Sequence, residues 1–335
     1  MNVNNEKDHP FISALLVTYN EEAYIEKALL SLINQTYPKK RYEILIIDGM
    51  STDKTIGIVN SIVMNLQNKE LSIRILENSK KILAAGWNIG IRNSIGDYVV
   101  RIDAHASVDE DFLEKSMETM LSVKDVVCVG GKLITKSLDE NDDTTVSKVL
   151  SSPFGVGNSS FRVSNSKGYV DTAVYGLYKK CIFEEVGYFD ESLVRNQDIE
   201  LHARIKKSGG KFYFNPEIKS TYYARNTVRK MLKQAYQNGK WNPIVQAKSR
   251  NALSIRHVIP FAFVIFLLLS SLLGITFKFF WYCELGVVLL HFFLGFVFAK
   301  KKTNNLIELI RMPLMFMGLH IMYGIGYLVG LFNKK

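Results

Sequence analysis

Three long apolar runs near the C-terminal end constrain this chain more than any other feature of its sequence. The runs cover residues 258–276, 279–299 and 312–332, and Glu284 is the one charged side chain in them. At about 1.5 Å per residue in a helix, each run reaches roughly 30 Å, the thickness of a bilayer's hydrocarbon core. A buried core helix is the alternative, but three such runs in succession, separated by basic residues, favour membrane insertion.

Charge indicates how these runs are oriented. The net charge is +10, and the segment from Val258 onward holds seven Lys/Arg against two Glu. Lys300–Lys302 and the basic segment Lys248–Arg256 fit cytoplasmic flanks of membrane spans under the positive-inside rule. The N-terminal residues show no signal peptide, so we expect a multi-pass protein of the cell membrane with its body in the cytoplasm. This charge distribution favours membrane lipids as partners and disfavours nucleic acid.

The first 225 residues alternate between short apolar runs and stretches with helical spacing. The apolar runs have no polar break, as in strands that are buried on both faces. This order predicts an α/β fold with a mostly parallel sheet and helices on both faces, whereas the polar stretch 135–169 predicts a long loop. The expected strands are Ile12–Thr18, Tyr42–Asp48, Ser72–Glu77, Tyr98–Asp103, Val126–Gly130 and Lys211–Phe214, and the expected helices are Glu21–Gln35, Thr52–Asn68, Leu83–Ser94, Asp111–Leu121 and Asp198–Ser208.

A basic amphipathic helix is predicted between this body and the apolar runs. Val228, Met231 and Ala235 fall at helical spacing, with Lys230 and Lys233 among the residues between them. Such a helix is typical of a segment that lies along a membrane surface. The sequence therefore predicts three parts: a body at 1–225, an interfacial segment at 226–257 and a membrane domain at 258–335.

Polar side chains follow three of the predicted strands. Tyr19 and Glu21 follow the first, Asp48 ends the second, and Asp103 with His105 ends the fourth. In open parallel sheets, ligands bind at the carboxyl ends of the strands. The sequence has no glycine-rich phosphate loop, so a bound nucleotide needs another source of positive charge. An Asp-x-His turn offers an oxygen and a nitrogen ligand for a divalent metal.

Four motifs together carry a family resemblance: ISALLVTYNEE, ILIIDGMSTDKT, AAGWNIGIRNSIGDYVVRIDAHA and VGYFDESLVRNQDIEL. They resemble the inverting GT-A glycosyltransferases of family two and, within it, the succinoglycan-type exopolysaccharide glucosyltransferases. The resemblance runs from about Phe11 to Trp241. It implies a GT-A fold, which is Rossmann-like with a mostly parallel sheet, a UDP-sugar donor and a divalent metal, Mn²⁺ or Mg²⁺.

The resemblance also implies roles for matching positions in the donor site. Tyr19 and Glu21 would line the nucleoside pocket, and Asp48 would bind the base. Asp103 would hold the ribose and, together with His105, the metal. The family usually has Asp at the position of His105, so this residue is a variant whose imidazole still suits Mn²⁺.

The remaining roles concern the transfer itself. Asp198 matches the family's general base, with Gln197 in place of the preceding Glu; the alternative is that Asp198 caps its helix. The acceptor-site motif of processive relatives is echoed by Gln237, Lys240 and Trp241, for which contact with the membrane surface is an equal alternative.

The expected function is transfer of a sugar, glucose by the resemblance, from a UDP-sugar to a polyprenyl-diphosphate-linked glycan in exopolysaccharide synthesis. Two alternatives stay open. A processive polysaccharide synthase has the same chemistry, but few spans are available here for a channel. A catalytically degenerate nucleotide-binding subunit is suggested by His105 and Gln197.

Overall fold

The computed structural model describes residues 9–66, 70–136, 144–157, 160–223 and 227–333. The chain divides into two compact units. One comprises Met1–Ile134 with Ser160–Tyr223, and the other Thr135–Ser159 with Ala224–Lys335. The predicted boundary at residues 225/226 lies outside the described residues, next to the observed change of unit.

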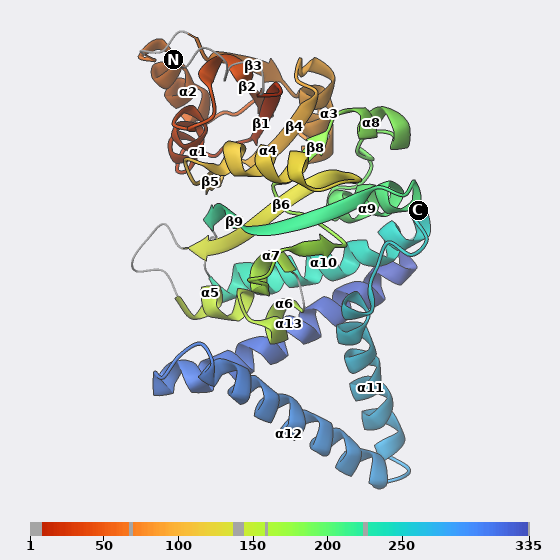
Figure 1. The fold of residues 1–335 in the computed structure, drawn as a ribbon. Helices are drawn as coiled ribbons and strands as arrows, with labels where there is room; N and C mark the ends of the chain where they lie inside the picture. Colours follow the sequence, from red (N-terminus) through yellow and green to blue (C-terminus); the bar gives the residue numbers. More distant parts are fainter. Residues whose placement is uncertain (1–8, 67–69, 137–143, 158–159, 224–226, 334–335) are drawn as a thin grey trace. The chain divides into compact units, whose positions relative to one another are not determined.

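Among the described residues, nine strands of the first unit form one sheet (Figure 1). β3 (Ser72–Glu77), β2 (Tyr42–Asp48), β1 (Ile12–Thr18) and β4 (Tyr98–Asp103) lie side by side and parallel, as predicted. The sheet continues through β8 (Leu177–Lys179), β6 (Val126–Lys136), β9 (Lys211–Tyr223) and β5 (Ala106–Val108), while β7 (Gly168–Val170) pairs with β9. β8 pairs antiparallel with both β4 and β6, so the parallel part ends at β4.

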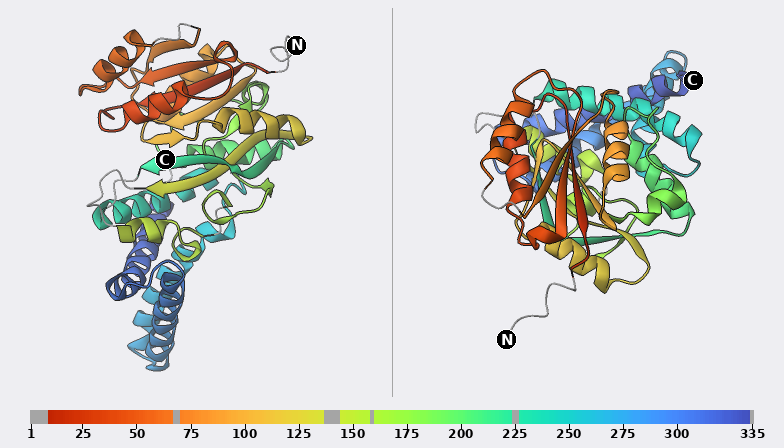
Figure 2. Two further views of the ribbon diagram at one scale, coloured as in Figure 1. Left: turned by 60° about the vertical axis from the view of Figure 1, so that its left-hand side comes forward. Right: turned by 90° about the horizontal axis from the view of Figure 1, so that it is seen from above.

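Helices cover both faces of this sheet (Figure 2, right). One core contains residues of α1 (Ile25–Ile33), α2 (Thr55–Met64) and α4 (Phe112–Ser122). The opposite core contains residues of α3 (Leu83–Asn93), α8 (Cys181–Val186) and α9 (Gln197–Lys207). Leu16 belongs to the first core and its neighbour Leu15 to the second. Because successive strand residues point to opposite faces, a strand buried on both sides is apolar throughout.

The stretch 135–169 differs from the predicted loop. It contains α5 (Thr144–Leu150), α6 (Pro153–Val156), α7 (Ser160–Val163) and the start of β7. Val146 and Val149 are fully buried in a core that they share with Met312 and Phe316. The local sequence is polar, and for this reason its pattern indicates a loop. Its few apolar residues are buried against residues far along the chain, which a local pattern does not reveal.

The second unit is otherwise helical. α10 (Val228–Lys248), α11 (Ile259–Gly274), α12 (Phe279–Lys300) and α13 (Leu306–Phe332) follow one another, and short 3₁₀ turns lie at Lys39–Arg41 in the first unit and Ile255–His257 in the second. α10 confirms the predicted helix. Its apolar residues Met231 and Ala235 are buried in a shared core with α13, so protein covers this face.

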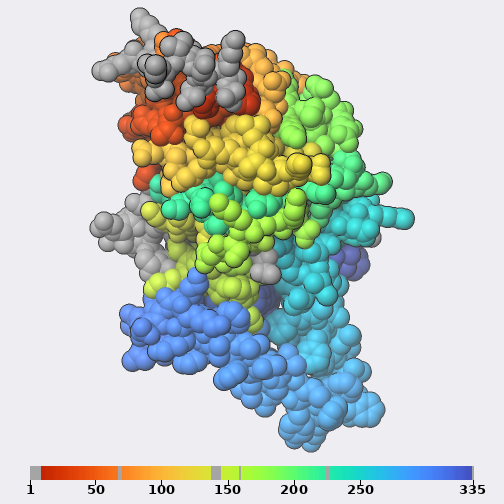
Figure 3. Space-filling model, viewed as in Figure 1, coloured from red at the N-terminus to blue at the C-terminus, as the bar shows by residue number. Residues whose placement is uncertain are grey.

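Two of the three predicted apolar spans form helices long and apolar enough to cross a membrane. Among the described residues these are α12, with 22 residues, and α13, with 27. α11 has 16 residues and reaches roughly 24 Å, which is shorter than the predicted run 258–276. Leu285, Leu289 and Phe293 of α12 are 55–62% exposed. Atoms of α12, in blue, are visible on the face drawn in Figure 3. Exposed apolar side chains of this size suit a lipid environment.

Candidate active site

The register of the sheet brings the predicted strand-end residues to one edge. Thr18 at the end of β1 pairs with Asp48 of β2, and Val17 pairs with Asp103 of β4. Asp48 and Asp103 therefore lie on either side of the β1 terminus. Tyr19 continues directly from that terminus. The strand ends that carry these residues therefore lie at one edge of the sheet, as predicted.

Hydrogen bonds fix the loop after β2 against the loop after β1. Asp48 accepts bonds from the backbone N–H of Ser51 at 2.9 Å and from its hydroxyl at 2.6 Å. Asn20 has a left-handed backbone, with φ of +52°, and its side-chain oxygen accepts from the N–H of Thr52 at 2.8 Å. These bonds hold Asp48 and the β1 end in a fixed relation before any ligand binds.

Tyr19 presents an aromatic face at this edge. Its side chain packs against Gly49, where an added Cβ would lie 3.1 Å from the Cβ of Tyr19. The ammonium of Lys81 lies 5.6 Å from the centre of the Tyr19 ring, and Tyr19 is 46% exposed. An exposed ring backed by glycine and a nearby cation suits a nucleotide base and its phosphates.

Asp103, His105 and Glu21 form the polar centre of the edge. Nδ1 of His105 lies 3.2 Å from Oε1 of Glu21, and Nε2 lies 4.0 Å from Oδ2 of Asp103. The contact with Glu21 fixes the ring, so that Nε2 faces Asp103. Both Asp103 and His105 keep more than a quarter of their side-chain surface exposed.

Asp103 and His105 are of the ligand types that a divalent metal takes. Their nearest ligand atoms lie 4.0 Å apart, farther than the roughly 3.0 Å between adjacent ligands of an octahedral ion with bonds of about 2.1 Å, so the two side chains would draw together to hold one ion. Among the described residues, no group of three or more His, Cys, Asp and Glu side chains is arranged to hold a metal. The protein thus offers a carboxylate and an imidazole, and leaves further ligand positions for a diphosphate and water.

Two tyrosines near Asp103 were not predicted from the sequence. The hydroxyl of Tyr175 donates to Oδ2 of Asp103 at 3.2 Å, and the Tyr222 ring lies 5.1 Å from the His105 ring. Burial, together with the charge of Asp103, raises the pKa of both tyrosines, so each stays a neutral donor at ordinary pH. Tyr175 also has a left-handed backbone, with φ of +46°, which is strained for a tyrosine. Neither lies in a recognisable motif.

Asp198 lies in the first turn of α9. The N-cap position is held by Asn196, with φ of +58° and no side-chain cap hydrogen bond, so Asp198 is the second residue of the helix rather than its N-cap residue. Oδ1 of Asp198 accepts from the N–H of Ile199 at 3.0 Å, and Oδ2 lies 3.6 Å from Nη2 of Arg101. The carboxylate is 37% exposed, which leaves it accessible to an acceptor hydroxyl.

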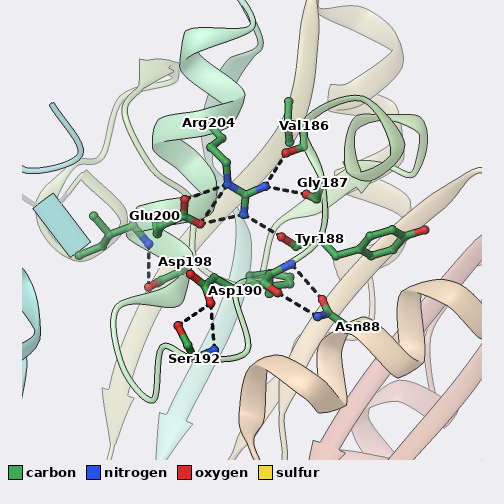
Figure 4. Close-up of polar contacts among 11 residues, drawn as sticks. Asn88, Val186, Gly187, Tyr188, Asp190, Ser192, Asp198, Glu200 and Arg204 are labelled. Carbon is green, nitrogen blue, oxygen red and sulfur yellow. Dashed lines mark hydrogen bonds and ion pairs between the residues drawn. The ribbon is translucent and has the colours of Figure 1, made fainter. Parts of the chain in front are cut away.

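The loop that precedes α9 is held by a network of hydrogen bonds (Figure 4). Arg204 is paired with Glu200 and donates to three successive backbone carbonyls, those of Val186, Gly187 and Tyr188, at 2.6–2.8 Å. Asn88 of α3 bonds both the N–H and the carbonyl of Phe189 at 2.9 Å. A loop tied at this many points places Asp198 on a rigid support.

The predicted acceptor residues belong to the second unit. Gln237, Lys240 and Trp241 are half-buried residues of α10, in the second unit. Gly239, between them, is buried against Tyr323 of α13. Their acceptor role stays a prediction.

Comparison with known proteins identifies the family of this chain. Residues 13–187 match the family model described as glycosyl transferase family 2. The chain belongs to this family. A Methanococcus voltae protein, dolichyl N-acetyl-alpha-D-glucosaminyl phosphate 3-beta-D-2,3-diacetamido-2,3-dideoxy-beta-D-glucuronosyltransferase, is 37% identical over 270 residues, which cover 78% of this chain and 81% of the relative. The succinoglycan biosynthesis protein ExoA of Rhizobium meliloti is 26% identical over 249 residues, 72% of each chain.

Solved structures agree on the fold. The mannosyltransferase PcManGT from Pyrobaculum calidifontis matches with a TM-score of 0.53 and 19% identity, over 72% of this chain and 69% of that one. At this identity the likeness concerns the fold alone. The body of this glycosyltransferase is thus a GT-A domain, as the four sequence motifs predict.

Proposed function

We propose that this glycosyltransferase moves one sugar from a UDP-sugar to a lipid-linked glycan at the cytoplasmic face of the cell membrane. The observation that carries the proposal is the sheet edge where Asp48 and Asp103 flank the end of β1, with His105 beside Asp103. Oxygen and nitrogen ligands next to an exposed aromatic ring suit a metal-bound nucleotide diphosphate. The donor as UDP-glucose rests on the resemblance to the succinoglycan-type enzymes.

Asp103 and His105 would hold the divalent metal, and Glu21 would orient the His105 ring. When bound, the ion supplies positive charge that stabilises the departing diphosphate. Asp48 and Tyr19 would hold the nucleoside beside it. Tyr175 would hold Asp103 in place through its hydroxyl. A carboxylate that is already fixed loses less entropy when it binds its ligand.

Asp198 would act as the general base of an inverting displacement. It accepts the proton of the acceptor hydroxyl while that oxygen forms a bond to the anomeric carbon. The bond from the same carbon to the diphosphate oxygen breaks, and UDP leaves with the electron pair. No enzyme nucleophile is required, since the acceptor oxygen attacks directly.

The acceptor is proposed to be a polyprenyl-diphosphate-linked glycan of a surface polysaccharide. The name of the Methanococcus voltae relative gives a dolichyl-phosphate-linked sugar as the acceptor of that protein. α12 and α13 would anchor this chain in the same membrane as such a lipid. Gln237, Lys240 and Trp241 of α10 would contact the acceptor, within a segment 226–257 that lies at the membrane surface.

A degenerate nucleotide-binding subunit is the second candidate, and one observation favours it. Gln197 stands where the family has Glu, and its buried Oε1 has no hydrogen-bond partner among the described residues. Such a subunit would bind UDP with the metal and never turn over. A processive synthase shares the chemistry of the main proposal and differs from it in the length of the product.

The test measures UDP release by the detergent-purified protein with a panel of UDP-sugars, a lipid extract of the host membrane, and either Mn²⁺ or excess chelator. We expect release with one sugar that depends on lipid and is lost on chelation. A single added sugar separates the proposal from a processive synthase. UDP binding without release in the presence of acceptor lipid favours the degenerate subunit, and absence of UDP binding contradicts the strand-end site.

Asp198→Asn is the matching variant. It should lower transfer by roughly 100-fold or more, within the range that a general base contributes, and leave UDP binding intact. Asp171→Asn serves as the control, because Asp171 is 77% exposed and paired only loosely with Lys206 at 3.4 Å. Loss of UDP binding in Asp198→Asn would remove Asp198 from the role of base.

A further inference from the structure

Arg101 is a buried charge whose place in the fold the nucleotide site does not explain. It lies on β4, a strand that is otherwise apolar up to its terminal Asp103, and its side chain is 10% exposed. Residues two apart on a strand point to the same face, so Arg101 lies below Asp103, one step deeper in the sheet. Burying a guanidinium is strongly unfavourable unless a carboxylate and hydrogen bonds compensate its charge.

Aromatic rings provide part of that compensation. The guanidinium carbon lies 5.5 Å from the centre of the Trp87 ring and 5.4 Å from that of Phe189. Cation–π contacts of this kind stabilise a desolvated arginine. They leave hydrogen-bonding capacity unused, and Nε of Arg101 has no hydrogen-bond partner among the described residues. The rings fix where the guanidinium lies without neutralising it.

Asp198 is the carboxylate that faces this cation, at 3.6 Å from Nη2. The neighbouring Gln197 is an amide and contributes no charge. The ion pair between α9 and Arg101 therefore depends on the side chain of Asp198 being turned inward.

The rings themselves are held by the network around the α8–α9 loop. Asn88, next to Trp87 on α3, bonds both backbone groups of Phe189 at 2.9 Å. Arg204 fixes the three carbonyls just before Phe189 (Figure 4). The two rings that pack on Arg101 come from α3 and from the loop, and hydrogen bonds join these two segments to each other.

We propose that Arg101 is a positioning residue for sugar transfer, which holds the Asp198 carboxylate in the orientation needed to accept the acceptor's proton. The role rests on the proposed function of Asp198 as the base. Arg101 itself touches neither donor nor acceptor. Its effect passes through the ion pair, and a carboxylate displaced by about 1 Å loses rate by roughly 100-fold.

The kinetic test compares Arg101→Ala, Arg101→Lys and Arg92→Ala. Arg92 also stacks on an aromatic ring, Tyr188, at 4.5 Å, but it is exposed, so Arg92→Ala is the matched control. We expect Arg101→Ala to lower kcat by about 100-fold while KM for the donor and the affinity for UDP stay unchanged. Added guanidinium chloride at millimolar concentration should restore part of kcat, Arg101→Lys should keep part of it, and Arg92→Ala should match the parent.

A second measurement needs no turnover. Asp198→Asn should lower the thermal unfolding temperature because it removes the carboxylate in ion-pair contact with the buried Arg101, and adding Arg101→Met should recover part of that loss. Such coupling is expected only of residues that interact directly. Three outcomes would overturn the proposal. One is that the two substitutions have additive effects on unfolding, and another is an unchanged kcat in Arg101→Ala. The third is a parallel loss of kcat, UDP binding and stability that guanidinium does not rescue. Absence of turnover in the parent with every donor overturns the proposed function, and the unfolding cycle then decides the pairing by itself.

Discussion

At the scale of single residues, buried charges divide into two kinds. Glu43 on β2 is fully buried, and its carboxylate accepts from the Ser13 hydroxyl at 2.7 Å, the Ile95 N–H at 2.9 Å and Arg74 at 2.8 Å. It is satisfied by the protein, as a structural charge must be. Arg101 is also buried but keeps a guanidinium nitrogen without a partner among the described residues. A buried polar atom without a partner is uncommon in folded proteins and calls for an explanation, which the positioning role of Arg101 supplies.

His202 gives a residue-scale prediction about pH. It is buried between the hydroxyls of Thr172 and Tyr178, each at 2.7 Å, and burial lowers its pKa from 6.5 to about 3. The neutral ring is therefore favoured in the folded state, and the unfolded state binds the proton first as pH falls. Between pH 6.5 and about 3, this residue should reduce the free energy of unfolding by up to about 1.4 kcal/mol per pH unit.

The measurement is the thermal unfolding temperature of the parent and of His202→Gln across pH 7 to 4. Other groups titrate in this range, so the difference between the two curves is the informative quantity. The variant should be less stable at pH 7, and the gap should narrow as pH falls. Curves that stay parallel would show that His202 does not contribute to acid sensitivity.

At the scale of elements, glycines decide how α10 and α13 pack. An added Cβ at Gly326 would lie 2.1 Å from the carbonyl oxygen of Tyr236, and one at Gly239 would lie 2.0 Å from that of Tyr323. Both distances are far below van der Waals contact, so the two backbones approach as closely as glycine allows. Small residues spaced four apart, as Gly326 and Gly330 are, favour this kind of helix contact.

Gly326→Ala should therefore destabilise the second unit. The new methyl group meets backbone, which cannot move aside like a flexible side chain, and we expect a cost of roughly 1–3 kcal/mol. Gly286→Ala on α12 is the matched control, because nothing lies within 4 Å of its added Cβ. Thermal unfolding in one detergent compares the two variants. Equal unfolding temperatures would contradict the close packing of α10 and α13.

At the scale of the whole molecule, the chain leaves the first unit and returns to it. Residues 135–159 belong with the C-terminal helices, although β6 before them and most of the segment after them belong to the GT-A body. Val146 and Val149 are buried with residues of α10 and α13. The two units are therefore joined at more than one point of the sequence, and a cut after Tyr223 does not separate them cleanly.

This predicts the behaviour of two fragments. Residues 1–223 should require detergent, because α5 and α6 lose the apolar partners that cover them. The same fragment with residues 137–157 replaced by a Gly/Ser linker should stay monomeric in buffer and bind UDP with Mn²⁺. Size-exclusion chromatography and UDP titration measure both. A soluble, monomeric unmodified fragment would show that α5 and α6 do not depend on the second unit.

The amino-acid sequence by itself predicted most of the GT-A body, the strand-end residues Asp48 and Asp103, and two of the apolar helices. These features depend on local sequence pattern. A strand that is buried on both faces is apolar throughout, and the length of an apolar run predicts whether its helix can span a membrane. Only the tertiary structure showed that 135–159 folds with the second unit, that α11 is short, and that Tyr175 and Arg101 lie beside Asp103 and Asp198. Such contacts join residues far apart along the chain, and burial and charge compensation are properties of the packed fold rather than of any local sequence pattern.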